Sequence, residues 1–157
     1  MNKAESHNAS VIVGDVPVSI QVKKMENGER RTILVFEKGL SVIITEAVSW
    51  GSAEDYPWQD GHVHHGLTES YTLISGWAIF LQVQEGGSLI KRTLDVPGET
   101  ITFEPGVPHK VLLGPAAVIS THKFGQGVPN PDRKNNDWWP ADDLFPQELL
   151  SLVPGSE

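Results

Sequence analysis

Short segments rich in β-branched and aromatic residues, separated by turn signals, run through most of this chain and limit the folds open to it. Gly- and Pro-containing turns punctuate them, for example at Glu26-Asn27-Gly28 and Val96-Pro97-Gly98. Strands this short, with hairpin turns between them, are typical of barrels and sandwiches, so the sequence predicts an all-β fold. The expected strands are 18–24, 32–36, 40–48, 71–75, 78–83, 89–94, 100–103, 110–113 and 117–123.

The length and the change of composition towards the C-terminus predict one domain with a tail. A chain of 157 residues can bury a core without disulfides. We predict an N-terminal extension or edge strand over 1–17, a barrel over 18–124, and a short irregular tail over 125–157. Trp138, Trp139 and Phe145 favour burial, so we expect the tail to pack on the barrel or on a partner subunit. A short helix is expected over 146–153.

Two histidines at alternate positions, His62 and His64, begin the segment that carries most of the chemistry. Residues two apart in a strand share a face, so both imidazoles can point to one place. Glu69 follows five positions after His64 and would face the other way in an unbroken strand. Gly66 permits a bend, after which Glu69 and Tyr71 face inward.

A further donor, His109, follows a Pro/Gly turn at 105–108 and begins the inward face of a returning strand. Three neutral imidazoles and one carboxylate leave one or two positions open on most first-row divalent metals. A closed structural zinc site would fill every position, usually with thiolates, and the chain has no cysteine. We therefore predict a catalytic type of metal site; the alternative is a hydrogen-bonded set of side chains without a metal.

Three neighbouring side chains have open roles. His65 has the wrong strand parity for a metal ligand. It is expected either to face solvent or to hydrogen-bond to a residue that itself binds the metal. His122 is expected to be a hydrogen-bonded barrel residue, with an acid or base role as the alternative. Tyr71 shares the parity of Glu69, so either it donates its hydroxyl to a substrate or it is an ordinary half-buried tyrosine.

Two motifs resemble the signature motifs of the cupin superfamily. The first covers residues 61–76 and has the family pattern at His62, His64, Glu69 and Gly76. The second is matched in part by Gly98, Gly106 and His109. The resemblance covers roughly residues 35–125 as a sequence pattern.

The resemblance implies a small jelly-roll barrel, the double-stranded β-helix, followed by the irregular C-terminal tail. It also implies metal-ligand roles for His62, His64, Glu69 and His109, with iron, manganese, nickel or zinc as the divalent ion. A homodimer is implied as well, since pairing covers exposed strand edges. The reaction does not carry over, because the superfamily hosts dioxygenases, isomerases, decarboxylases, sugar-binding sensors and storage proteins.

Composition excludes several classes of partner. A formal net charge of -8 with only 12 Lys and Arg argues against binding nucleic acid. No apolar stretch reaches signal-peptide or membrane-spanning length, so we expect no membrane partner and a cytoplasmic location. The absence of cysteine fits a reducing compartment.

The first functional hypothesis is a mononuclear metal enzyme acting on a small organic, anionic or enolisable molecule by oxygenase-type or isomerase/lyase chemistry. Glu69 and Tyr71 are its candidate catalytic residues. The second hypothesis is a non-catalytic small-molecule-binding protein. The third, a phosphosugar isomerase, needs basic groups beside the metal. Lys110 and Lys123 are candidates for it, but strand parity points them away from His109 and His122.

Overall fold

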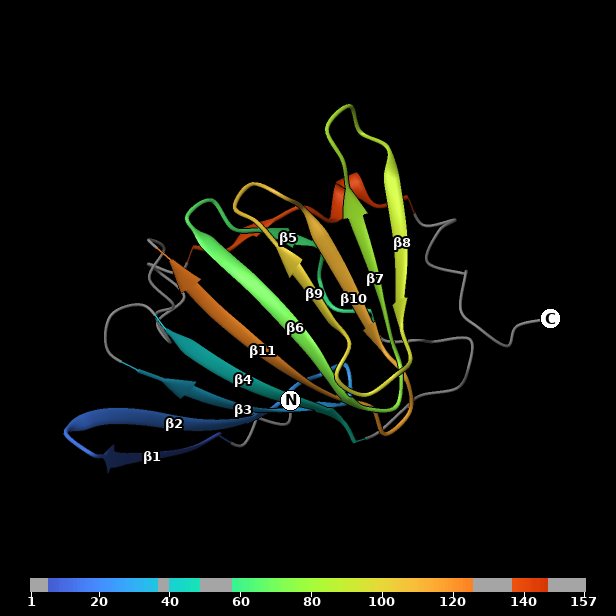
Figure 1. Cartoon of the computed structure of the whole chain (residues 1–157). Helices are drawn as coiled ribbons and strands as arrows, with labels where there is room; N and C mark the ends of the chain where they lie inside the picture. The colour runs from blue at the N-terminus through green and yellow to red at the C-terminus, as the bar shows by residue number, and fades with distance from the viewer. Residues whose placement is uncertain (1–5, 37–39, 49–57, 126–136, 147–157) are drawn as a thin grey trace.

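The computed structural model describes residues 6–36, 40–48, 58–125 and 137–146, which form two antiparallel sheets facing each other (Figure 1). The larger sheet has the order β1 (Ser6–Val13), β2 (Val16–Lys24), β3 (Glu29–Val35), β4 (Ser41–Ala47), β11 (Val118–Gly125), β6 (Leu67–Ser75) and β9 (Thr100–Phe103). The smaller sheet has the order β12 (Trp139–Pro140), β5 (His62–Val63), β10 (His109–Leu113), β7 (Ala78–Val83) and β8 (Leu89–Leu94). A single 3-10 turn, Asp142–Leu144, follows β12 in the described part of the tail.

The all-β prediction is confirmed, and the strands at 78–83, 89–94 and 100–103 have the predicted bounds. The predicted N-terminal region contains the edge strand β1, which pairs with β2 and extends the larger sheet at the lower left of Figure 1. The domain bounds themselves stay a prediction, and the helix expected over 146–153 falls almost entirely outside the described residues. Among the described residues, no helix is long and apolar enough to cross a membrane.

The core lies between the sheets and draws on both. Alternate residues of β6 are buried, as the sequence pattern predicts, and they meet the inward residues of β7, β9, β10 and β11. The buried cluster is Ala47, Tyr71, Leu73, Ala78, Phe80, Leu94, Ile101, Phe103, Val111, Leu113, Ala117 and Ile119. Burying each of the larger aliphatic and aromatic side chains in this cluster contributes roughly 1.5–3 kcal/mol.

Strand register divides the interior into an apolar end and a polar end. Leu73 pairs with Ile119 at the apolar end. At the polar end, Glu69 of β6 pairs with Phe103 on one side and with Lys123 of β11 on the other. Because paired residues in neighbouring strands share a face, the register places a carboxylate and an ammonium group together inside the barrel.

Two tryptophans cover the outer face of the smaller sheet. Trp58 and Trp77 pack against the buried residues Ile79 and Leu112, which point away from the interior. These two tryptophans therefore supply packing area on that face.

Gly76, between β6 and β7, has a positive φ of 78°, and an added Cβ would lie 2.8 Å from the Ala117 Cα. Gly76→Ala should therefore destabilise the protein by about 2–4 kcal/mol, combining backbone strain with overpacking. Gly98→Ala is the matched control, because Gly98 has a φ of 94° but open space around its Cβ position. Denaturant unfolding should show a cost of about 1–2 kcal/mol for this control. Equal costs for the two variants would contradict the packing argument.

Candidate metal centre

The four predicted donors are brought together by a short strand, a bend and two strand starts. His62 lies in β5, which ends at Val63, and a bend at His65-Gly66 allows β6 to begin at Leu67. The bend shifts the alternation, so Glu69 faces the same side as the histidines. His109 is the first residue of β10 and pairs directly with His62.

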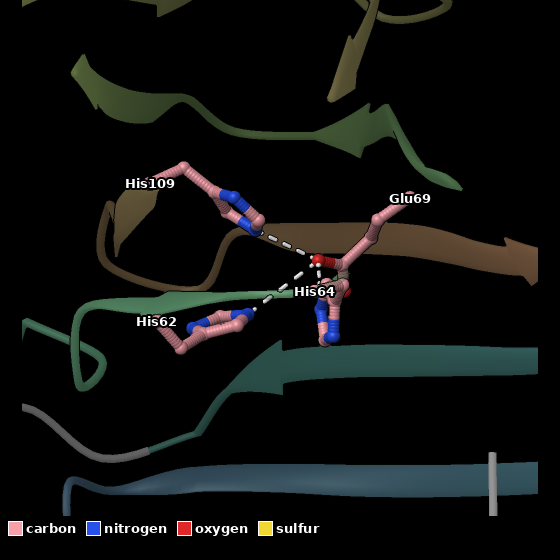
Figure 2. A group of neighbouring side chains, drawn as sticks. All are labelled: His62, His64, Glu69 and His109. Atoms are coloured by element: carbon pink, nitrogen blue, oxygen red, sulfur yellow. Dashed lines mark hydrogen bonds and ion pairs between the residues drawn. The ribbon is translucent and has the colours of Figure 1, made fainter. Parts of the chain in front are cut away.

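All four side chains are buried, with exposed fractions from 1% for His109 to 5% for His62. One potential ligand atom from each residue lies within 4.8 Å of the others. The three Nε2 atoms surround one oxygen of Glu69, Oε2, at 2.8 Å for His109, 2.9 Å for His64 and 3.5 Å for His62. Figure 2 shows the three interactions meeting on that oxygen. The structure thus assembles a group that could hold a metal ion.

Hydrogen bonds on the far side of each ring show that this group suits a cation. The Nδ1 atom of His62 lies 2.9 Å from the Asp60 carbonyl, and that of His109 lies 3.0 Å from the Val107 carbonyl. His64 Nδ1 contacts the Asp137 carbonyl. A carbonyl only accepts, so each Nδ1 carries the hydrogen, and a neutral ring then has its lone pair on Nε2.

Three nitrogen lone pairs facing a carboxylate oxygen repel one another unless a proton or a cation lies among them. His62 Nε2 is buried and has no hydrogen-bond partner in the described structure. A divalent ion bound by the three nitrogens and Glu69 would satisfy every one of these atoms, and imidazole and carboxylate suit iron, manganese, nickel and zinc. The donor set therefore fits a transition metal.

The charge states around the group also favour metal binding. Burial lowers the pKa of the His62 imidazole, which keeps that ring neutral and able to bind a metal. For Glu69, burial opposes ionisation, but Lys123 and the three histidines outweigh it and hold the pKa of this carboxyl well below its usual value. Glu69 is therefore an anion inside the barrel.

Lys123, which sequence reasoning considered only as a phosphate-binding group and then disfavoured on parity, lies beside the donor group. Its Nζ atom lies 3.2 Å from Glu69 Oε1, and its side chain is only 13% exposed. Parity does point Lys123 away from His122, as predicted, and this same parity turns it towards Glu69. His122 pairs with Ser70 and Val42 on the outer face and lies 3.4 Å from the Ser120 hydroxyl, so its ring is not part of the donor group.

The other candidates have distinct surroundings. His65 is exposed and its ring lies beside that of Trp139, as its parity predicts. Tyr71 is buried and packs against Phe80, with its ring 6.1 Å from that of His109. Burial raises the pKa of the Tyr71 phenol well above its usual value, and the Glu69 carboxylate adds to the rise, so the phenol stays protonated. Lys110 forms an ion pair of 2.5 Å with Asp142 outside the donor group.

The described part of the tail contacts the donor group from outside, a contribution that no sequence motif indicated. β12 pairs with β5, and the Asp137 carboxylate accepts hydrogen bonds from the backbone N–H groups of His65, Gly66 and Leu67, at 2.6–2.9 Å. Trp138 stacks on the His62 ring at 5.6 Å. The expectation that both tail tryptophans are buried is wrong, since Trp138 is 36% and Trp139 54% exposed. Trp138 contacts His62 with one face, and β12 lies at the sheet edge.

Comparison with known proteins gives matches in structure alone. No protein-family model matches the sequence, and no curated protein matches it. KdgF from Halomonas sp. gives a TM-score of 0.52 at 17% identity, over 67% of this chain and 86% of that one. A conserved protein with a double-stranded β-helix domain from Klebsiella pneumoniae gives a TM-score of 0.54 at 20% identity, over 75% of this chain and 83% of that one. Oxalate decarboxylase from Bacillus subtilis gives 0.58 at 17% identity, over 94% of this chain but 34% of that one.

The arrangement of two facing antiparallel sheets is the same architecture as in these structural neighbours. The fold is the double-stranded β-helix of the cupins. This confirms the fold that the sequence motifs implied. Within the cupin fold, the donor group is built from β5, β6 and β10, and β11 adds a lysine beside it.

Asp137→Asn should lower the stability of the metal-free protein by about 1–3 kcal/mol, because it weakens the hydrogen bonds that the Asp137 carboxylate accepts from three backbone N–H groups. It should also weaken metal binding by about 10- to 100-fold, because the side-chain hydrogen bonds hold in place the backbone carbonyl that orients His64. Thermal unfolding and competition with a chelator measure the two effects. Asp143→Asn, an exposed acid in the same segment, should change stability by about 0.5 kcal/mol or less. Equal effects of both variants would exclude an orienting role for Asp137.

Proposed function

We propose that this protein binds one divalent transition metal ion through His62, His64, Glu69 and His109 and acts as an enzyme on a small anionic or enolisable organic molecule. One observation carries the proposal: three buried imidazoles, each with its Nδ1 bonded to a carbonyl, face one ionised carboxylate oxygen. The structural neighbours support it, since one of them, oxalate decarboxylase, is described with Mn(II) centres.

Each residue of the proposed site has a definable part in this function. The three histidines hold the ion, and their Nδ1 hydrogen bonds fix the direction of each ring. Bound there, a divalent ion supplies Lewis-acid chemistry that polarises substrate oxygens, with redox chemistry in addition if it is iron. Glu69 is ionised and serves first as a ligand, becoming a candidate base only when one of its oxygens leaves its partner, whereas Tyr71 is protonated and can donate a hydrogen bond.

The pairing of a proton acceptor with a proton donor favours isomerase or lyase chemistry over oxygenase chemistry. Such reactions move a proton at a carbon next to a carbonyl, and this requires groups in opposite protonation states. Tyr71 supplies the protonated group from the inward position next to Glu69 on β6, and Glu69 supplies the base once one of its oxygens is released. Oxygenase-type turnover and non-catalytic binding are the other outcomes that the experiments below distinguish.

Elemental analysis of protein purified without added metal should find about one transition ion per chain. His62→Ala, His64→Ala and His109→Ala should each lose most of it, because removing one nitrogen leaves an incomplete site. His65→Ala and His122→Ala are the matched controls and should keep the ion, since neither ring faces the donor group. Unchanged metal content in the three ligand variants would refute the proposed site.

The reaction class can be tested by NMR. A panel of 2-oxo acids and diketones is incubated with the protein in D2O, and exchange of their carbon-bound hydrogen is followed. Tyr71→Phe should keep the metal but lower exchange or turnover by about 10²-fold, because it removes the protonated hydroxyl. Consumption of dioxygen by the loaded protein would indicate oxygenase chemistry instead. Tight binding of a panel compound with neither exchange nor oxygen uptake would indicate a non-catalytic binding protein.

A further inference from the structure

Lys123 is a lysine in an unusual place, because its charged end lies inside the barrel. It pairs in register with Glu69 of β6 and with Ser41 of β4, so all three residues share the inward face of the larger sheet. Ser41 is 2% exposed and the Lys123 side chain 13% exposed. Placing an ammonium group in such surroundings costs free energy unless a specific partner compensates for it.

The partner is one particular oxygen of the Glu69 carboxylate. Oε2 faces the three imidazole nitrogens, whereas Oε1 lies 3.2 Å from Lys123 Nζ. The two oxygens therefore have separate partners on separate sides. A carboxylate without such a partner can turn both oxygens towards a metal ion, as bidentate carboxylates do.

We propose that Lys123 is a positioning residue that restricts Glu69 to one-oxygen coordination and cancels its charge, so that the site selects anionic over neutral small ligands. This inference rests on the proposed metal function. One oxygen of Glu69 then occupies one coordination position instead of two, which leaves more positions open. With Glu69 and Lys123 cancelling each other, the full charge of the divalent ion is available to attract an anion.

Neighbouring charges do not supply this effect. Arg31 forms its own ion pair with the buried Glu29 at 2.6 Å, and Lys110 forms one with Asp142. The Asp137 carboxylate is engaged by three backbone N–H groups. In the described part of the chain, Lys123 is thus the cationic side chain that forms an ion pair with Glu69 of the donor group.

The test uses the whole 157-residue chain loaded with Co2+, whose visible absorption weakens as its coordination number rises. Wild type is titrated with oxalate, a small dianion, and with imidazole, a neutral ligand, and both affinities are read from the spectrum. Lys123→Met removes both the charge and the contact to Oε1. It should weaken oxalate binding by about tenfold or more, leave imidazole binding within about twofold, and give a weaker absorption band.

Lys123→Gln separates the two parts of the proposal and serves if the Met variant does not fold. It keeps an N–H donor for Oε1 but has no charge, so it should keep the stronger band of the wild type and still bind oxalate more weakly. Oxalate affinity and spectrum equal to those of the wild type in either folded variant would overturn the inference. Failure of the wild type to take up Co2+ would refute the metal function itself, which is a separate result.

Discussion

The ionised carboxylate of Glu69 is buried inside the barrel and therefore needs compensating partners, which the surrounding structure supplies. A bare carboxylate anion in an apolar interior costs several kcal/mol, and a buried charge persists only with close partners of opposite charge or with good hydrogen bonds. Here the partners come from both sheets: Lys123 from β11 and the imidazoles of β5, β10 and the bend. The polar end of the interior is organised around this one group.

Much of the site could be predicted from local sequence. The alternation of His62 and His64, the bend permitted by Gly66, and the return of the chain at His109 are each encoded within a few residues. Strand periodicity then specifies which side chains face inward, and the structure has the predicted faces for Glu69 and Tyr71. Local pattern was sufficient because each of these features depends on backbone geometry next to the residue itself.

The missed residues depend on which strands lie side by side, and this is a non-local property. Lys123 and Asp137 are 54 and 68 positions after Glu69 in the sequence, and only the pairings of β11 with β6 and of β12 with β5 bring them to the site. Trp138 and Trp139 were expected to be buried by packing of the tail, on hydrophobicity alone. In the structure Trp139 lies on the edge strand β12 and Trp138 directly precedes it, where one face of an aromatic ring can pack while the other meets solvent.

The pairing of β12 with β5 couples the docking of residues 137–146 to the state of the donor group, although the two segments are far apart in the sequence. β5 is only two residues long, and one of its neighbours is contributed by the tail. Since Asp137 and Trp138 contact His64 and His62, any free energy by which the docked tail favours metal binding is returned equally as metal-dependent stabilisation of the docked tail. If the proposed ion is bound, its withdrawal would loosen residues 137–146, and occupancy of the interior site would then be measurable as a change in hydrogen exchange along that segment.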